Sequence, residues 1–308
     1  MTTFQRPRFR AHAAAEPVAP GTPPLLEVKE VSKRFPVRVS PTRKAYVSAV
    51  DSLSFTVKKG TTVGIVGESG CGKSTAARLI LGLLPLDEGD VLFEGWNIGD
   101  ARATPQTHQD RRQIRRNMQM VFQDPHSALN PRASIGEIIA FPMKVHGFSK
   151  EEQGERTRWL LEQVGLHGNH ASYYPHQMSG GQRQRVNIAR ALALSPKLVV
   201  CDEAVSALDK SVQAQVLNLL QDLQEELSLT YVFISHDLNV VQYMSDEVLV
   251  MYLGQAAEMT SSEALFARPL HPYTQALLAS IPRLDDDDAP AVQAPPLEGE
   301  LPSPLNPP

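Results

Sequence analysis

The residues with the clearest chemistry form the glycine-rich segment VGESGCGKST at positions 66–75. Gly67, Gly72, Lys73 and Ser74 match the spacing of a phosphate-binding loop at every fixed position. Glycines let backbone N–H groups turn toward phosphates, while the lysine supplies a positive charge and the serine a hydroxyl for Mg²⁺. We predict that a nucleoside triphosphate binds here, through Gly67, Ser69, Gly70, Cys71, Gly72, Lys73, Ser74 and Thr75.

Two acidic residues follow the apolar segment KLVVC further along the chain. A strand that ends in Asp202 and Glu203 would bring one carboxylate to Mg²⁺ and a second to an attacking water. Taken alone, such a pair is usually the solvated end of a strand. The phosphate loop upstream favours the functional interpretation.

A second segment able to bind an anion begins at Ser179, in MSGGQRQRVNIARALALSP. Its serine hydroxyl and glycine N–H groups would lie at the positive end of a helix dipole, although an ordinary capped helix looks the same. Because the chain already has one phosphate loop, this second anion-binding segment indicates a γ-phosphate that is held from the opposite side by another subunit. The residues concerned are Ser179, Gly180, Gly181 and Gln182, and the inward-facing helix positions are Val186, Ile188, Ala189, Leu192 and Leu194.

The elements that must position these groups alternate between strands and helices. The segments 61–67, 197–203 and 231–237 are short apolar runs that end in glycine or polar residues, which is typical of strands covered on both faces. This alternation predicts a largely parallel α/β core, in which ligands bind at the carboxyl ends of the strands. A helix that includes residues 211–227 is predicted from the apolar positions Val212, Val216, Leu219, Leu220, Leu223 and Leu227.

Composition narrows the class of protein. The chain has 308 residues, 42% of them hydrophobic and 21% charged, which indicates one large or two modest globular domains. A net charge of -4 offers no broad basic surface for nucleic acid and no strong attraction to anionic lipid. The sequence has neither a spanning apolar run nor a signal-peptide pattern, so we expect a cytoplasmic chain. Cys71 and Cys201 are interpreted as small reduced side chains.

The two ends differ from the middle. Residues 1–24 are rich in Pro and Ala and carry three arginines, and residues 285–308 combine an acidic run with proline-rich sequence. Neither composition favours regular packed elements. We expect mobile arms or extended segments at both ends.

The segment SGGQRQRVNIARAL, with the phosphate loop before it and CDEAVSALD after it, resembles the nucleotide-binding subunit of an ATP-binding cassette (ABC) transporter over roughly residues 25–284. The resemblance implies an α/β fold, a P-loop NTPase ABC cassette with a RecA-like, mostly parallel sheet core, an antiparallel β subdomain and an inserted helical subdomain at about 125–185. It also implies three parts: an N-terminal arm at 1–24, a nucleotide-binding domain at 25–266 and a C-terminal extension at 267–308.

The same resemblance assigns roles to single residues. Gln123 in VFQDP matches the glutamine that senses Mg²⁺ and the membrane partner, His236 in FISHDL matches the histidine that contacts the γ-phosphate, and Asp209 in SALD matches an aspartate of the dimer interface. An isolated histidine after a strand is more often a capping or core residue. The implied catalytic residues are Glu203, His236, Lys73 and Gln123, and the implied metal ligands are Ser74, Gln123 and Asp202.

The aromatic residue that stacks on adenine has two candidates upstream of the phosphate loop. Phe35 lies in SKRFPV and Tyr46 in RKAYVSAV. The context of Phe35 resembles the family position better, so we favour it. Either ring can instead be a packing residue of a sheet, and this is the better interpretation of Tyr46.

Two further segments indicate which subfamily of ABC transporters the sequence resembles. FQDPHSALNPR (122–132) and RPLHPYTQALLASIPRL (268–284) resemble the ATPase subunits of dipeptide and oligopeptide importers, whose relatives also import nickel or glutathione. In many relatives a cysteine-bearing tail follows that can bind an iron–sulfur cluster. We do not predict such a cluster for this sequence. The second segment predicts a helix after Pro272 with a packing face formed by Tyr273, Ala276, Leu277 and Ile281.

The function implied by the resemblance is ATP hydrolysis, with Mg²⁺, that drives uptake of dipeptides or oligopeptides. Its implied partners are two transmembrane permease subunits, a second ABC ATPase subunit (a paralogue or a second copy) and, indirectly, a substrate-binding protein. Its implied location is the cytoplasmic face of the inner membrane. An importer of nickel or glutathione remains an alternative, as does a soluble ABC ATPase acting on nucleic acid or ribosomes. The single cassette and the acidic balance disfavour the soluble ATPase, and we expect no nucleic-acid partner.

Overall fold

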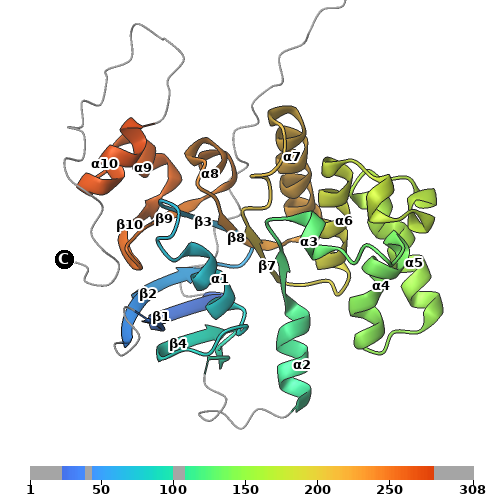
Figure 1. The fold of residues 1–308 in the computed structure, drawn as a ribbon, viewed down its shortest axis with the longest axis horizontal. Helices are drawn as coiled ribbons and strands as arrows, with labels where there is room; N and C mark the ends of the chain where they lie inside the picture. Colours follow the sequence, from blue (N-terminus) through green and yellow to red (C-terminus); the bar gives the residue numbers. More distant parts are fainter. Residues whose placement is uncertain (1–22, 39–43, 100–107, 281–308) are drawn as a thin grey trace, which may run out of the picture.

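The computed structural model describes residues 23–38, 44–99 and 108–280. Nearly all of the predicted N-terminal arm, and the acidic and proline-rich segment at 285–308, lie outside the described residues. Within them, two β-sheets and a group of helices form the molecule (Figure 1).

A six-stranded sheet forms the centre of the fold, with the strand order β10-β9-β3-β8-β7-β6. The neighbours from β9 to β6 are parallel, and β10 is an antiparallel edge strand. Every residue of β3, β7 and β8 is buried, which explains why their sequences are mainly apolar and confirms the three predicted strands. The strands are β3 (Thr62–Val66), β6 (Met118–Val121), β7 (Leu198–Asp202), β8 (Thr230–Ile234), β9 (Glu247–Tyr252) and β10 (Gln255–Ser261).

An antiparallel sheet with the order β2-β1-β4-β5 covers one face of this centre. Helix α1 (Lys73–Ile80) shares its core, in which Val200 and Val232 of the central sheet also lie. The strands are β1 (Leu26–Arg38), β2 (Lys44–Val57), β4 (Glu88–Phe93) and β5 (Trp96–Asn97). The phosphate loop, which leads into α1, is therefore placed between the two sheets.

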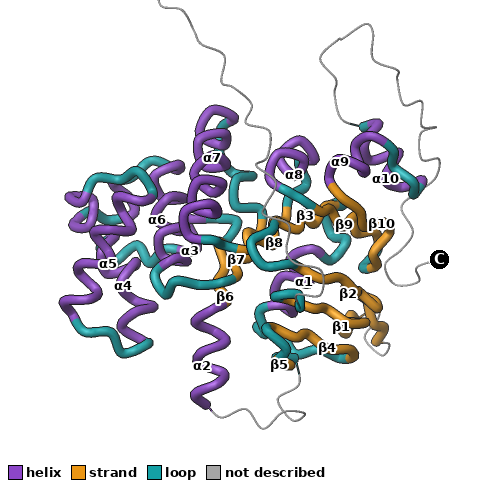
Figure 2. The backbone as a smooth tube through the Cα atoms, turned by 180° about the vertical axis from the view of Figure 1, so that it is seen from behind, coloured by secondary structure: helices purple, strands orange, loops and turns teal. Residues whose placement is uncertain are grey.

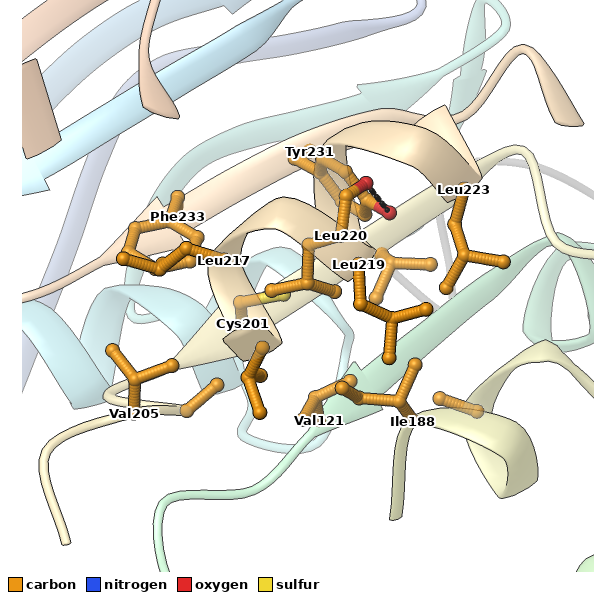
Figure 3. Packing of buried hydrophobic residues seen from close by; sticks show 14 of the residues in the cluster. Val121, Ile188, Cys201, Val205, Leu217, Leu219, Leu220, Leu223, Tyr231 and Phe233 are labelled. Atoms are coloured by element: carbon orange, nitrogen blue, oxygen red, sulfur yellow. Dashed lines mark hydrogen bonds between the residues drawn. The ribbon is translucent and has the colours of Figure 1, made fainter. Parts of the chain in front are cut away.

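Helices α6 (Gly180–Leu192), α7 (Lys210–Leu227) and α8 (Leu238–Met244) contribute to the core on the opposite face. Alternate residues of the parallel strands point there, among them Cys201, Tyr231 and Phe233 (Figure 3). The Tyr231 hydroxyl donates to the Leu220 carbonyl oxygen at 3.0 Å, so the polar end of this buried ring is satisfied. The apolar positions predicted for α6 are all buried, and so are Val216, Leu219, Leu220 and Leu223 of α7.

Between β6 and β7 the chain forms several helices joined by short loops. The elements are α3 (Pro125–Ala128), α4 (Ile135–Val145), α5 (Lys150–Gln163), the 3-10 helices Gly168–Ser172 and Pro175–Gln177, and α6; helix α2 (His108–Asn117) precedes β6. Helices α4 and α5 lie at the end of the molecule away from the antiparallel sheet (Figures 1 and 2). Capping boxes start both helices, at Ser134 and Ser149. The predicted fold class, a mostly parallel core with an antiparallel β part and a helical insertion, is confirmed.

Two helices follow β10: α9 (Ser262–Ala267) and α10 (Pro272–Ala279). Helix α10 begins at Pro272, as the sequence predicts, and Tyr273 is buried. The predicted packing face needs one correction, because Thr274 shares the buried face with Tyr273. The buried leucine is therefore Leu278, one turn after Thr274, while Ala276 and Leu277 are partly buried and Ile281 lies outside the described residues. No helix in the described ranges has the length and apolar character needed to cross a membrane.

Candidate nucleotide-binding site

The phosphate loop runs from Gly67 to Thr75, between the end of β3 and the first turn of α1. Gly67, Gly70 and Gly72 have φ angles of 150°, 84° and 106°, which residues other than glycine rarely adopt. Two of the three glycines also pack against other strands. A Cβ at Gly67 would lie 2.2 Å from the Met251 carbonyl oxygen of β9, and one at Gly72 would lie 2.1 Å from the Ala49 carbonyl oxygen of β2.

Lys73 lies inside this loop and is 5% exposed. Its ammonium donates to the carbonyl oxygens of Gly67 at 2.7 Å and Glu68 at 2.8 Å. The residue before it, Gly72, is the N-cap of α1 and provides no side-chain acceptor for the first N–H groups of the helix. A buried cation and uncapped N–H groups at a helix start together form a surface suited to phosphate. Cys71 also faces this interior, and burial raises the pKa of its thiol.

Ser74 and Asp202 meet across the site. The Ser74 hydroxyl donates to Asp202 Oδ1 at 2.9 Å, which joins the start of α1 to the end of β7. Asp202 is 5% exposed, and this burial raises the pKa of its carboxyl; the Ser74 hydrogen bond opposes the shift and the charge of Glu203 adds to it. A buried carboxylate beside a hydroxyl provides the hard oxygen ligands that Mg²⁺ prefers.

Glu203, Gln123 and His236 form a cluster at the carboxyl ends of three adjacent strands, β7, β6 and β8. Gln123 Nε2 donates to Glu203 Oε2 at 2.7 Å, and His236 Nδ1 lies 3.4 Å from Glu203 Oε1. Glu203 has a φ of 47°, in the left-handed region, where the chain turns at the end of β7. The three side chains come from positions far apart in the sequence, so the sheet topology brings them together as the strand-end argument predicts.

The segment that starts α6 lies elsewhere in the same chain. Ser179 caps its own helix: its Oγ accepts the Gln182 N–H at 3.2 Å, and Gln182 Oε1 accepts the Ser179 N–H at 2.9 Å. Gly181 packs against α7, since a Cβ there would lie 2.4 Å from Val212 Cγ1. In the part of the chain that the structure describes, no hydrogen bond joins Ser179, Gly180, Gly181 or Gln182 to the phosphate loop.

Asp209 is likewise a helix cap. It accepts the Val212 N–H at 2.9 Å and the Ser211 hydroxyl at 2.7 Å at the start of α7. These hydrogen bonds, led by the one from Val212, lower the pKa of the Asp209 carboxyl, so it remains charged at neutral pH. Its chain neighbour Leu208 lies near the start of α6, since a Cβ at Gly180 would lie 3.9 Å from Leu208 Cδ2.

The two candidate adenine-stacking residues lie on neighbouring strands. Phe35 of β1 pairs with Val47 of β2, whereas Tyr46 pairs with Pro36, so the two rings lie on opposite faces of the β1–β2 ribbon. Only one of them can therefore stack on a given base. Phe35 is 37% exposed and Tyr46 is 62% exposed.

Three contacts of the loop have no signal in the sequence motif. They are the close approaches of the Ala49 and Met251 carbonyls described above, and a hydrogen bond from the Glu68 N–H to the Tyr273 hydroxyl at 3.1 Å. Each joins residues far apart in the chain. An amphipathic pattern marks Tyr273 as a packing residue, but it carries no information about which loop the hydroxyl reaches.

The fold and this site define a P-loop ATPase of the ATP-binding-cassette class. The ABC transporter family profile matches residues 50–206, and the profile for the oligopeptide/dipeptide transporter C-terminal region matches residues 257–308. The chain belongs to the ABC transporter family. It is 50% identical to the oligopeptide transport ATP-binding protein AppF of Bacillus subtilis, over 92% of this chain and 86% of AppF.

Another relative and two solved structures are also similar to this chain. Identity to the dipeptide transport ATP-binding protein DppF of Escherichia coli is 47%, over 92% of this chain and 84% of that protein. Among solved structures, the ATP-binding cassette MJ0796, a dimer bound to ADP and Pi, has a TM-score of 0.66 and 29% identity over 77% of this chain and 98% of that one. The cbiO1 protein of Clostridium perfringens, part of an ABC transporter complex, has a TM-score of 0.67 and 27% identity over 80% and 91%.

Proposed function

We propose that this chain is the ATP-hydrolysing subunit of an ABC importer that takes up dipeptides or oligopeptides. The observation that carries the proposal is the convergence of Lys73, Ser74, Asp202, Glu203 and His236 at one edge of the parallel sheet. The relatives named above, which are oligopeptide and dipeptide transport ATP-binding proteins, support peptides as the cargo.

In this proposal the phosphate loop binds the triphosphate of ATP. The ammonium of Lys73 exchanges its two loop carbonyls for phosphate oxygens, and the N–H groups at the start of α1 add their partial positive charge. Ser74, Asp202 and the amide oxygen of Gln123 suit Mg²⁺, which when bound neutralises charge on the phosphates. Phe35 is proposed to stack on the adenine.

Glu203 is proposed to orient the attacking water and accept its proton. Its two carboxylate oxygens already contact Gln123 and His236, so the carboxylate has a fixed orientation at the strand end. His236 is 57% exposed on its side chain and can reach the γ-phosphate, where a donor stabilises the developing charge. A general base of this kind contributes roughly 10²–10⁴-fold to the rate.

A second cassette is proposed to complete each site. The start of α6 (Ser179, Gly180, Gly181 and Gln182) and Asp209 do not contact their own phosphate loop, yet they present a helix start with anion-binding N–H groups. In a head-to-tail pair of cassettes, this helix start would face the γ-phosphate bound by the partner. We propose a partner cassette, either a second copy or a paralogue, and two permease subunits that hold the pair at the cytoplasmic face of the membrane.

The experiment is peptide uptake in cells that lack this chain, complemented with variants. Wild-type protein should restore uptake of labelled dipeptides and oligopeptides, and Glu203→Gln should not, because it keeps the shape of the side chain and removes its basic carboxylate. The matched control is Glu226→Gln, which changes an exposed carboxylate on α7. Normal peptide uptake in the deletion strain, together with lost nickel or glutathione uptake, would exclude peptides as the cargo.

The partners can be identified from the same variant. Glu203→Gln protein purified from native membranes with MgATP should retain two multi-span membrane proteins and a second cassette. Recovery of ribosomal or nucleic-acid complexes alone would contradict the transport proposal and leave the ATPase chemistry untouched.

A further inference from the structure

The C-terminal extension contacts the phosphate loop directly. Tyr273 lies in the first turn of α10, is 4% exposed, and its hydroxyl oxygen accepts the backbone N–H of Glu68 at 3.1 Å. Glu68 is the second residue of the phosphate loop, 205 positions earlier in the chain. The carbonyl of the same residue accepts from Lys73 Nζ at 2.8 Å. Both backbone polar groups of Glu68 are therefore held, one by the extension and one by the phosphate-binding lysine.

The ring that carries this hydroxyl has little freedom. It packs against Tyr252 at the end of β9, with ring centroids 4.3 Å apart and an angle of 38° between the planes. Burial raises the pKa of Tyr273 to about 12, so the phenol stays neutral at physiological pH and its oxygen remains an acceptor of the Glu68 N–H. The same end of β9 leads to Gly254, whose N–H donates to the Cys71 carbonyl at 3.0 Å.

The start of α10 is also fixed to the sheet. The carboxylate of Glu258 on β10 accepts the N–H groups of Leu270 and His271 at 3.0 and 2.9 Å, and His271 Nδ1 accepts the Tyr273 N–H at 3.1 Å. Burial alone would raise the pKa of Glu258, but the hydrogen bonds from His271 and Leu270 lower it, so the anchor is charged at neutral pH. A continuous chain of contacts therefore runs from β10, through α10, to the phosphate loop.

We propose that Tyr273 is a positioning residue for nucleotide binding, and that through it the C-terminal extension sets the affinity of this subunit for ATP. By holding the Glu68 N–H, the hydroxyl fixes the start of the loop, so that the N–H groups that follow are preorganised for phosphate. The inference rests on the proposal that this loop binds ATP. It assigns to the extension a role at the nucleotide site in addition to packing.

The test compares Tyr273→Phe with wild type in the full chain. The variant removes the hydroxyl and keeps the ring against Tyr252. One lost hydrogen bond should weaken equilibrium binding of MgATP by about five-fold and raise the KM for ATP equally, with kcat at saturating ATP unchanged. Tyr252→Phe is the matched control, because it removes a hydroxyl from the neighbouring ring and leaves the contact between Tyr273 and Glu68 in place; its affinity should equal that of wild type.

Amide hydrogen exchange, measured without nucleotide, separates this inference from the function on which it rests. The Glu68 amide should exchange faster in Tyr273→Phe than in wild type or Tyr252→Phe. If both the exchange rate and the MgATP affinity of Tyr273→Phe match those of wild type, the positioning role is wrong. If Tyr252→Phe lowers the affinity as much as Tyr273→Phe does, ring packing rather than the hydroxyl is responsible, and the proposal is also overturned. Failure of wild-type protein to bind MgATP would overturn the proposed function and with it the role in affinity, while the exchange rate would still test the hydrogen bond.

Discussion

Replacing Gly72 by alanine tests how the antiparallel sheet shapes the phosphate loop. The substitution places a side chain at a φ of 106°, at a cost of about 1–2 kcal/mol. Its Cβ would lie 2.1 Å from the Ala49 carbonyl oxygen, a backbone atom of β2 that cannot rotate away. Strand β2 must retreat by roughly 1 Å, and forcing extra volume into a packed site costs about 1–3 kcal/mol more. The expected loss in the free energy of unfolding is therefore about 2–5 kcal/mol.

Gly70→Ala is the matched control for this prediction. Gly70 also has a positive φ, 84°, but a Cβ there would meet nothing within 4 Å. It should cost only the backbone strain, about 1–2 kcal/mol. Urea unfolding without nucleotide, followed by circular dichroism, measures both variants. Equal stability of Gly72→Ala and Gly70→Ala would refute the argument that β2 makes glycine necessary at position 72.

Two more predictions concern buried polar groups. Because burial raises the folded-state pKa of Asp202 above its ordinary value of 3.8, this carboxyl binds its proton more tightly in the folded protein than in the unfolded chain, and its own contribution to stability falls as pH rises above about 4. Asp202→Asn should therefore raise the melting temperature at pH 7 without nucleotide, by a margin that shrinks as pH falls toward 4. The same variant should abolish Mg²⁺-dependent hydrolysis. A melting temperature at pH 7 below that of wild type would contradict the argument from burial. Tyr231→Phe removes the hydrogen bond to Leu220 and should lower the free energy of unfolding by about 1 kcal/mol in urea titrations, with unchanged affinity for ATP; a loss of affinity would show that this core position affects the site.

Three strands of the parallel core, β3, β7 and β8, could be predicted from the sequence because they are short, mainly apolar and followed by glycine or polar groups. That pattern placed Asp202, Glu203 and His236 at the ends of adjacent strands, and the topology brings Glu203 and His236 to within 3.4 Å. The predicted face of α7 follows from the same physics, since Val216 and Leu220 are buried against the sheet. Local periodicity is sufficient for these elements because burial on one or both faces determines their composition.

Contacts between distant segments could not be predicted in the same way. The sequence identifies Gly72 as part of a phosphate loop, but only the fold shows that Ala49 packs against it. The hydroxyl of Tyr273 reaches Glu68 from the start of α10, where Glu258 of β10 accepts the His271 N–H. Helical spacing predicts that Tyr273 is buried and says nothing about the partner of its polar end.

The role of the start of α6 at a nucleotide remains a prediction, because it too depends on a contact between distant parts. Within this chain Ser179 caps its own helix and does not meet the phosphate loop. Its serine–glycine helix start is local and can be recognised in the sequence, whereas the nucleotide that it is proposed to contact would be bound by another cassette. The proposed roles of Ser179 and Asp209 therefore depend on assembly, and mutation of either should affect hydrolysis more than the affinity of the isolated chain for ATP.

The most direct test of the proposed chemistry is single-turnover hydrolysis of γ-labelled ATP by the purified full chain, with ATP binding measured on the same samples. Glu203→Gln should bind MgATP as wild type does and hydrolyse it about 10²–10⁴-fold more slowly, because the shape of the side chain is kept and its basic carboxylate is lost. Hydrolysis by Glu203→Gln at the wild-type rate, with ATP bound, would contradict the assignment of Glu203 as the general base.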